Sequence, residues 1–145
     1  MNNEEGSGLF CSHPLENVYI GRDLSYDSNK SGGYSPFYRN NNIRTVSFGD
    51  SVTTIGDNLF QYCENLTNVT IGKNVTDIKS YAFYGCYNLT NIYCKAINPP
   101  TMYDDSVLSN DVTDRTIYVP TASVDAYKSS PYWEEYADSI VGYDF

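Results

Sequence analysis

The sequence repeats itself with a period of 23 residues. Residues 58–71 read NLFQYCENLTNVTI and residues 81–94 read YAFYGCYNLTNIYC, so phenylalanine, cysteine and leucine recur at the same places. Four units begin 28, 23 and 23 residues apart, at Leu15, Ile43, Leu66 and Leu89. A period of this length is typical of proteins in which each unit forms one coil and stacks on the next. The repeat constrains the fold more than any other feature of the chain.

Apolar side chains fall at fixed steps within each unit. They occupy steps 0, 3, 5, 9 and 12 after the first residue, as in Leu66, Val69, Ile71, Val75 and Ile78. Steps 3 and 5 alternate as in a strand, and the glycine at step 6 (Gly21, Gly49, Gly72) predicts a turn with positive φ. Steps 9 and 12 predict a second buried side of the coil. One unit alone buries too few side chains to offset the entropy of ordering it, so the units must share a core in a solenoid.

The first two units depart from this pattern. The longer first interval contains SYDSNKSGGYSPF (residues 25–37), whose serine, glycine and proline content predicts a loop inserted into one coil. Phe37 restores the phase, since it precedes Ile43 by as many residues as Phe60 precedes Leu66. The second unit has Asn40 where later units have cysteine, and Cys11 is one place out of step in the first. We expect these coils to be the weaker ones.

The repeat resembles a known family. LTNVTI fits the leucine-rich-repeat spacing L-x-x-L-x-L. Residues 55–92, IGDNLFQYCENLTNVTIGKNVTDIKSYAFYGCYNLTNI, resemble the BspA-like leucine-rich repeats of bacterial cell-surface proteins, and the resemblance covers about residues 9–97. It implies a β-rich leucine-rich-repeat solenoid of the α/β right-handed superhelix type, with about 3.5 units of 23 residues. Asn74 occupies the family's asparagine place, but Asp23 and Ser51 replace it elsewhere, so no continuous asparagine ladder is expected.

The remaining segments are expected to flank this array. Residues 98–145 resemble the ending of such arrays, and Thr116 to Val119 could add a final strand. In SPYWEEYADSI, Ser130 fits a helix N-cap with Pro131 at the first helical position. Helical spacing would then give one apolar face for a C-terminal cap, made of Trp133, Tyr136, Ala137 and Ile140. Residues 1–8 are expected to be a linker or a truncated start, and because no comparable cap precedes the repeats, upstream repeats of the same parent chain are expected there.

Composition disfavours nucleic acid and membranes as partners. The chain has 145 residues, a formal charge of -9 and a pI near 4.3, so nucleic acid and anionic membranes are disfavoured partners. It contains no run of about 18 apolar residues that would insert into a membrane, and its start lacks the features of a signal peptide. The resemblance nevertheless implies an extracellular or cell-surface location for the mature segment.

The four cysteines are expected to be structural. There is no CxxC pair, and the one histidine, His13, stands near only Cys11, so a zinc site is not expected. Because one unit separates Cys63 from Cys86, they should lie about one strand spacing apart, roughly 4.8 Å. We expect a stacked, reduced pair, although a disulfide is compatible with that distance. Cys94 is expected in the core.

No catalytic or metal-binding motif is present. His13 has no nucleophile partner in a known motif. The adjacent carboxylates Glu134-Glu135 and Asp104-Asp105 should diverge into solvent instead of converging in a cleft. The stretch 104–114 lacks the ordered spacing of a calcium loop. The chain is therefore expected to be non-enzymatic, without cofactor or metal. Five N-x-S/T sequons are interpreted as structural positions of the repeat, at Asn29, Asn65, Asn68, Asn74 and Asn88.

A polar and aromatic strip is the candidate binding site. The strand period sends the residues between the apolar steps to the solvent face, which gives Asn17, Tyr19, Thr45, Ser47, Asn68, Thr70, Asn91 and Tyr93. Tyrosine offers apolar area and a hydroxyl at small entropic cost, which suits recognition of protein or glycan. With the family resemblance to adhesins, this predicts an extracellular binding or adhesion module for a host protein or glycan. The alternative function is a structural spacer without its own ligand. The alternative interpretation of the strip is an ordinary strand surface whose polar residues keep the protein soluble.

Overall fold

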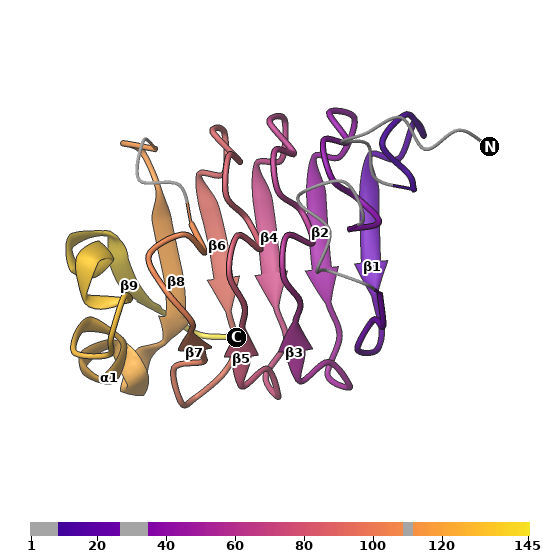
Figure 1. Ribbon diagram of the computed structural model, residues 1–145. Helices are drawn as coiled ribbons and strands as arrows, with labels where there is room; N and C mark the ends of the chain where they lie inside the picture. Colours follow the sequence, from indigo (N-terminus) through magenta and orange to yellow (C-terminus); the bar gives the residue numbers. More distant parts are fainter. Residues whose placement is uncertain (1–8, 27–34, 109–111) are drawn as a thin grey trace.

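The computed structural model describes residues 9–26, 35–108 and 112–145. Their coils are stacked along one axis and contribute to two sheets, each made of parallel strands (Figure 1). The large sheet has the strand order β1-β2-β4-β6-β8-β9, with bounds Asn17–Ile20, Thr45–Phe48, Asn68–Ile71, Asn91–Cys94, Thr116–Pro120 and Ile140–Tyr143. The small sheet has the order β3-β5-β7, with bounds Thr54–Ile55, Asp77–Ile78 and Thr101–Met102. Each coil gives one strand to the large sheet, and three coils also give one to the small sheet, as the two groups of apolar steps predict.

The strand register repeats the sequence register. Val46 of β2 pairs with Val69 of β4, which pairs with Ile92 of β6, and all three are buried. In the small sheet, Ile55 pairs with Ile78, and Ile78 with Met102. Equivalent residues therefore lie one strand apart, and the predicted repeat solenoid is confirmed.

A row of stacked phenylalanine rings runs through the core. The Phe37 and Phe60 rings stack with centroids 4.9 Å apart, and Phe60 and Phe83 stack with centroids 6.0 Å apart. Phe10 continues the row beside Phe37 at 5.5 Å. The prediction that Phe37 restores the phase after the insertion is confirmed, whereas most of that inserted loop, with Asn29, lies outside the described residues.

The strand-ending glycines correct one prediction. Gly21, Gly49 and Gly72 do not have positive φ, although Gly85 does, at 76°. A Cβ on Gly72 would lie 2.5 Å from the carbonyl oxygen of Gly49, and one on Gly49 would lie 2.3 Å from the Tyr19 hydroxyl. Backbone atoms of the preceding coil therefore leave no room for a side chain at Gly72, whereas at Gly49 only the movable end of the Tyr19 side chain comes close, and neither glycine adopts an unusual backbone conformation.

Side chains that bind backbone carbonyls join successive coils. The Cys63 thiol donates to the Phe37 carbonyl and the Cys86 thiol to the Phe60 carbonyl, both at 3.1 Å. Asn40, at the same place one coil earlier, donates to the Phe10 carbonyl at 2.6 Å. The expectation of reduced, stacked cysteines is confirmed, and Cys94 is fully buried as predicted.

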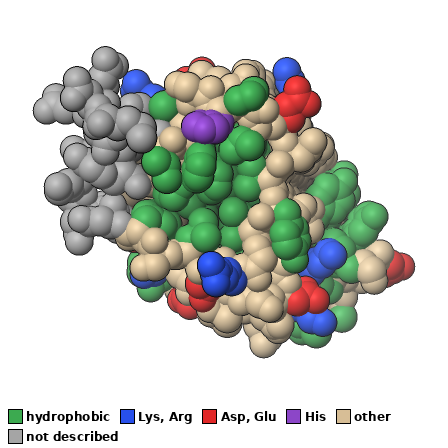
Figure 2. Space-filling view, turned by 90° about the vertical axis from the view of Figure 1, so that its right-hand side faces the viewer, with side chains coloured by type: hydrophobic (Ala, Val, Ile, Leu, Met, Phe, Trp, Pro, Cys, Tyr) green, Lys and Arg blue, Asp and Glu red, His purple; other side chains and the backbone are tan. Residues whose placement is uncertain are grey.

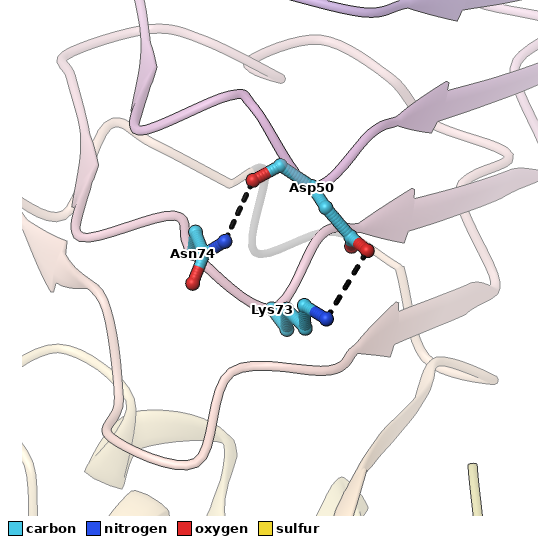
Figure 3. Close-up of polar contacts among 3 residues, drawn as sticks. All are labelled: Asp50, Lys73 and Asn74. Atoms are coloured by element: carbon cyan, nitrogen blue, oxygen red, sulfur yellow. Dashed lines mark hydrogen bonds and ion pairs between the residues drawn. The ribbon is translucent and has the colours of Figure 1, made fainter.

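Asparagine side chains at the turns also join successive coils by donating hydrogen bonds to backbone carbonyls. Asn65, Asn74 and Asn88 each donate to a carbonyl of the preceding coil at 2.7 Å, which gives these sequon residues the structural role that was expected. Figure 3 shows Asn74 bonded to the Asp50 carbonyl, with the Lys73 ammonium 3.4 Å from the Asp50 carboxylate.

The C-terminal segment differs from the single helix expected over residues 130–140. Helix α1 spans Val124–Lys128, and a kinked 3₁₀ helix, η2, spans Glu134–Ser139. Ser130 is no N-cap, because its hydroxyl donates back to the Ala126 carbonyl at 2.9 Å. Ile140 begins strand β9, whose pairing with β8 requires an extended backbone. The predicted strand over Thr116 to Val119 is confirmed as part of β8.

Two aromatic side chains of this segment are nevertheless core residues. Trp133 is buried and its indole N–H donates to the Pro100 carbonyl at 2.8 Å. The buried Tyr127 hydroxyl donates to the Ala96 carbonyl at 2.6 Å. The role of this segment as a cap remains a prediction. So do the handedness of the coil and the expected boundaries of the repeat region, 9–97, and of the cap, 98–145. Within the described parts of the chain, no helix is long and apolar enough to cross a membrane.

The opposite end of the stack shows its apolar interior. Figure 2, which views the β1 end, shows hydrophobic side chains gathered in the middle of this face. Phe10, Leu15 and Val18 pack against the core but are only partly buried, and Leu24 is exposed. Among the described residues, β1 has a neighbouring strand on one side only.

Candidate interaction surface on the large sheet

The eight residues predicted as a strip lie together in two rows on the outer face of the large sheet. In the first row, Asn17 pairs with Thr45, Thr45 with Asn68, and Asn68 with Asn91. In the second row, the same pairings join Tyr19, Ser47, Thr70 and Tyr93 in that order. None of the eight is buried, because their neighbours along each strand take the inward positions. The structure thus brings all eight residues onto one surface.

Some side chains of the first row form hydrogen bonds with each other. The Thr45 hydroxyl donates to the Asn17 side-chain oxygen. The Asn91 amide donates to the Asn68 side-chain oxygen at 2.9 Å. These bonds hold the amides in fixed orientations across the strands, which leaves fewer groups for a ligand than the residue types alone suggested.

The second row has a tyrosine at each end and small residues between them. Tyr19 is 72% exposed and its ring lies over Gly49, while Ser47 and Thr70 form the middle of the row. Three strand spacings of roughly 4.8 Å place β1 and β6 about 14 Å apart. The row is therefore a shallow polar floor with an aromatic ring at either end.

Tyr93 belongs to a larger aromatic cluster, defined here as Tyr93, Tyr118, Tyr143 and Phe145. The Tyr93 and Tyr118 rings stack with centroids 4.5 Å apart and an interplanar angle of 7°. Tyr143 stands at 75° to Tyr93 and 73° to Tyr118, with centroids 5.6 and 5.5 Å away. The Phe145 centroid lies 4.8 Å from that of Tyr143. The C-terminal end of the sheet thus carries four aromatic rings on its outer face.

Sequence reasoning missed three members of this cluster. Tyr118 could have been found, because Thr116 to Val119 was expected to form a strand and Tyr118 aligns with Tyr93 one strand away. Tyr143 and Phe145 could not, because residues 140–143 give no repeat signal and β9 was not expected.

A surface hollow of about 380 Å³ lies beside this cluster. It is lined by Thr70, Tyr93, Lys95, Tyr143, Asp144 and Phe145. Loss of water, together with the neighbouring Tyr118 and Tyr143, raises the pKa of Tyr93. Like any tyrosine, it is neutral at physiological pH and its phenol can donate a hydrogen bond. The hollow therefore combines aromatic walls with donors and acceptors at its rim.

The outward positions of the strands in this sheet carry no charged side chain. Across β1, β2, β4, β6, β8 and β9 the outward residues that the structure describes are Asn, Thr, Ser, Tyr, Pro and Val. The whole chain, in contrast, has 18 acidic and 9 basic residues. Charge is thus confined to the margins of this face, where Lys95 and Asp144 stand.

Other residues considered from the sequence form no second site. His13 is exposed, with its ring edge-on to Phe10 at 5.4 Å. Asp104 does not simply face solvent as expected, because its carboxylate accepts hydrogen bonds from Ser80, at 2.6 Å, and Ser106. Partial burial raises the pKa of Asp104, but the hydrogen bonds from Ser106 and Ser80 outweigh it, so the pKa is lowered overall. Within the described ranges no group of three or more His, Cys, Asp or Glu residues could hold a metal ion.

Comparison with protein families settles the identity of the repeat. A family model described as "BspA type Leucine rich repeat region (6 copies)" matches residues 30–124, about two thirds of the chain. The chain belongs to the BspA-type leucine-rich repeat family. No curated protein matches the sequence at a significant level.

Membership in the BspA-type family fits the geometry of the two sheets. The family consists of repeat modules used for protein interaction, which are typically non-enzymatic scaffolds and typically extracellular or at the cell surface. In this chain the regular strand face of the repeats carries the two-row strip and the aromatic cluster. The match extends beyond residue 97 because β7 and Leu108 continue the coil, Leu108 forming a parallel bridge with Phe83.

Proposed function

We propose that this chain is a non-enzymatic adhesion module, exposed outside the cell, that presents the outer face of its large sheet to a host protein or glycan. The observation that carries the proposal is the pairing of Tyr19, Ser47, Thr70 and Tyr93 into one uncharged, solvent-facing row. Exposed tyrosines on a rigid sheet bind with little loss of conformational entropy. The absence of charge on the strand face argues against nucleic acid, and we expect no membrane insertion by this segment.

The test is a binding screen with matched variants. Wild type, Tyr19→Ala and Tyr93→Ala are applied to a panel of extracellular-matrix proteins and a glycan array. Tyr103→Ala is the control, because Tyr103 is 50% exposed but follows β7 of the small sheet. The proposal expects binding that either strip variant weakens about tenfold or more and that the control retains. Equal binding by all four proteins would contradict it.

A structural spacer is the second candidate function. The hydrogen bonds within the first row favour it, because they use the polar groups to join strands instead of leaving them for a ligand. In that case wild type binds nothing on either panel. The exposed apolar end at β1 would then matter most, as the place where upstream repeats of the parent chain continue the array, with the C-terminal segment as the cap of the opposite end.

A further inference from the structure

The aromatic cluster supplies the surface that a sugar ring needs. A pyranose ring has an apolar face of C–H groups, and such groups are attracted to the electron-rich faces of aromatic rings. Tyr93 and Tyr143 stand nearly perpendicular to each other and line the same hollow, with Phe145 beside them. At about 380 Å³ the hollow is within the range of small-ligand sites, about 300–1,000 Å³.

Polar groups at the rim match hydroxyls. A sugar hydroxyl both donates and accepts, so neighbouring hydroxyls are best met by a donor and an acceptor placed together. Lys95 offers an ammonium that only donates, Asp144 a carboxylate that only accepts, and Thr70 a hydroxyl that does both. The Asp144 carboxylate is steadied by the Thr121 hydroxyl, which donates to it at 3.2 Å.

The charges decide which ligands are excluded. Because the rim holds one ammonium, of Lys95, and one carboxylate, of Asp144, their opposite charges offset each other and give a charged ligand of either sign no net attraction. The Asp144 carboxylate and the net charge of -9 oppose sialylated, sulfated or uronic-acid glycans. What remains is a ligand that is uncharged, rich in hydroxyls and partly apolar.

We infer that the hollow beside Tyr93, Tyr143 and Phe145 is a subsite for one residue of a neutral saccharide, with Lys95, Asp144 and Thr70 binding its hydroxyls. This inference rests on the proposed function, because it names the ligand class for one end of the same sheet face. It predicts that Tyr143, which lies outside the strip expected from sequence, contributes as much to binding as Tyr93.

The experiment measures glycan binding by wild type and three variants. Neutral oligosaccharides of glucose, mannose, galactose and N-acetylglucosamine are compared with sialylated and sulfated ones on an array, and hits are titrated by calorimetry. Tyr93→Ala and Tyr143→Ala should weaken a neutral hit about tenfold or more, while Tyr103→Ala should match wild type. Circular dichroism and thermal unfolding establish that each variant is folded. Affinity should change less than about twofold between about 50 and about 500 mM NaCl, because no ion pair forms with the ligand.

Each outcome separates this inference from the broader proposal. A neutral glycan lost in Tyr143→Ala and kept in Tyr103→Ala supports both. Binding restricted to acidic glycans, or a neutral glycan bound equally by Tyr143→Ala and wild type, overturns the saccharide subsite. If no glycan binds but a matrix protein is captured through Tyr19 and Tyr93, the subsite is wrong and the adhesion surface stands; if nothing binds, both are wrong.

Discussion

The buried thiols of this chain are structural groups and not reactive ones. Cys63 and Cys86 are fully buried and each donates to a phenylalanine carbonyl of the preceding coil. Burial raises the pKa of Cys63 to about 12 and that of Cys86 well above its usual value. Burial likewise raises the pKa of Cys94 to about 11. Since the thiolate is the nucleophile, these three side chains are inert at neutral pH, whereas Cys11 is only partly buried.

Alkylation should therefore report on each cysteine separately. In native protein at about pH 8, iodoacetamide is expected to modify Cys11 alone, because the raised pKa values keep the buried thiols protonated. In denaturant without reductant, all four cysteines should react. Intact mass and peptide mapping measure both. A loss of two additions in the unfolded sample would reveal a disulfide and contradict the reduced arrangement.

Gly72 should tolerate substitution much less well than Gly21. A Cβ at position 72 would meet the backbone oxygens of Gly49 and Phe48 at 2.5 and 2.8 Å, which cannot move without parting two coils. We expect Gly72→Ala to lower the free energy of unfolding by about 2–3 kcal/mol. Gly21→Ala should cost less than about 0.5 kcal/mol, because its Cβ would meet only the exposed Tyr19 ring, at 3.2 Å. Urea unfolding of both variants measures the difference, and equal losses would contradict the close-approach explanation.

At the scale of one coil, turn asparagines hold each unit to the previous one. Asn65, Asn74 and Asn88 each donate to a carbonyl 24 residues earlier. The carbonyls that accept these bonds belong to turn residues outside the strands. One side chain in each turn thus fixes the spacing of the stack where backbone pairing has ended.

Asn74→Ala should test the strength of this link. Removing the bond to the Asp50 carbonyl is expected to cost about 1 kcal/mol of unfolding free energy. Asn98→Ala is the matched control, since Asn98 occupies the corresponding turn of the next coil, is exposed and makes no such bond. Chemical denaturation compares the two. If both variants lose the same stability, the asparagine link is not what holds the turn.

Elements inside the repeat could be predicted from sequence, and those after it could not. Val69 and Ile71 predict β4 because apolar residues recur at the same steps in neighbouring units, which a chance alternation of residues would not produce. No such repetition supports residues 124–143. There the spacing of Trp133, Tyr136 and Ile140 is helical, but pairing between Ile140 and Ile117 overrides it and forms β9. The same pairing places Tyr143 beside Tyr93, which is why Tyr143 and Phe145 could not be foreseen, whereas Tyr118 could have been.

For the whole molecule, stability should vary along the stack. Coils in the middle, such as those of β4 and β6, have a neighbour on both sides, whereas β1 has one only among the described residues (Figure 1). The β1 end also leaves apolar side chains partly open to water (Figure 2), while Trp133 and Tyr127 are buried at the other end. In arrays where each unit contacts only its neighbours, stability is roughly the sum of unit and interface contributions. The β1 coil should therefore open first.

Hydrogen exchange can detect this opening with two matched amides. The Thr45 amide donates to the Glu16 carbonyl and the Asn91 amide to the Thr67 carbonyl, both at 3.1 Å and at equivalent places of their strands. Thr45 loses its partner when the β1 coil opens, but Asn91 does so only when the middle of the stack opens. We expect the Thr45 amide to exchange at least about tenfold faster, a difference of about 1.4 kcal/mol in opening free energy. Measurement at low protein concentration keeps association at the β1 edge from protecting Thr45. Equal protection under those conditions would mean that the coils open together, so that the stack behaves as one cooperative unit and not as a row of neighbours.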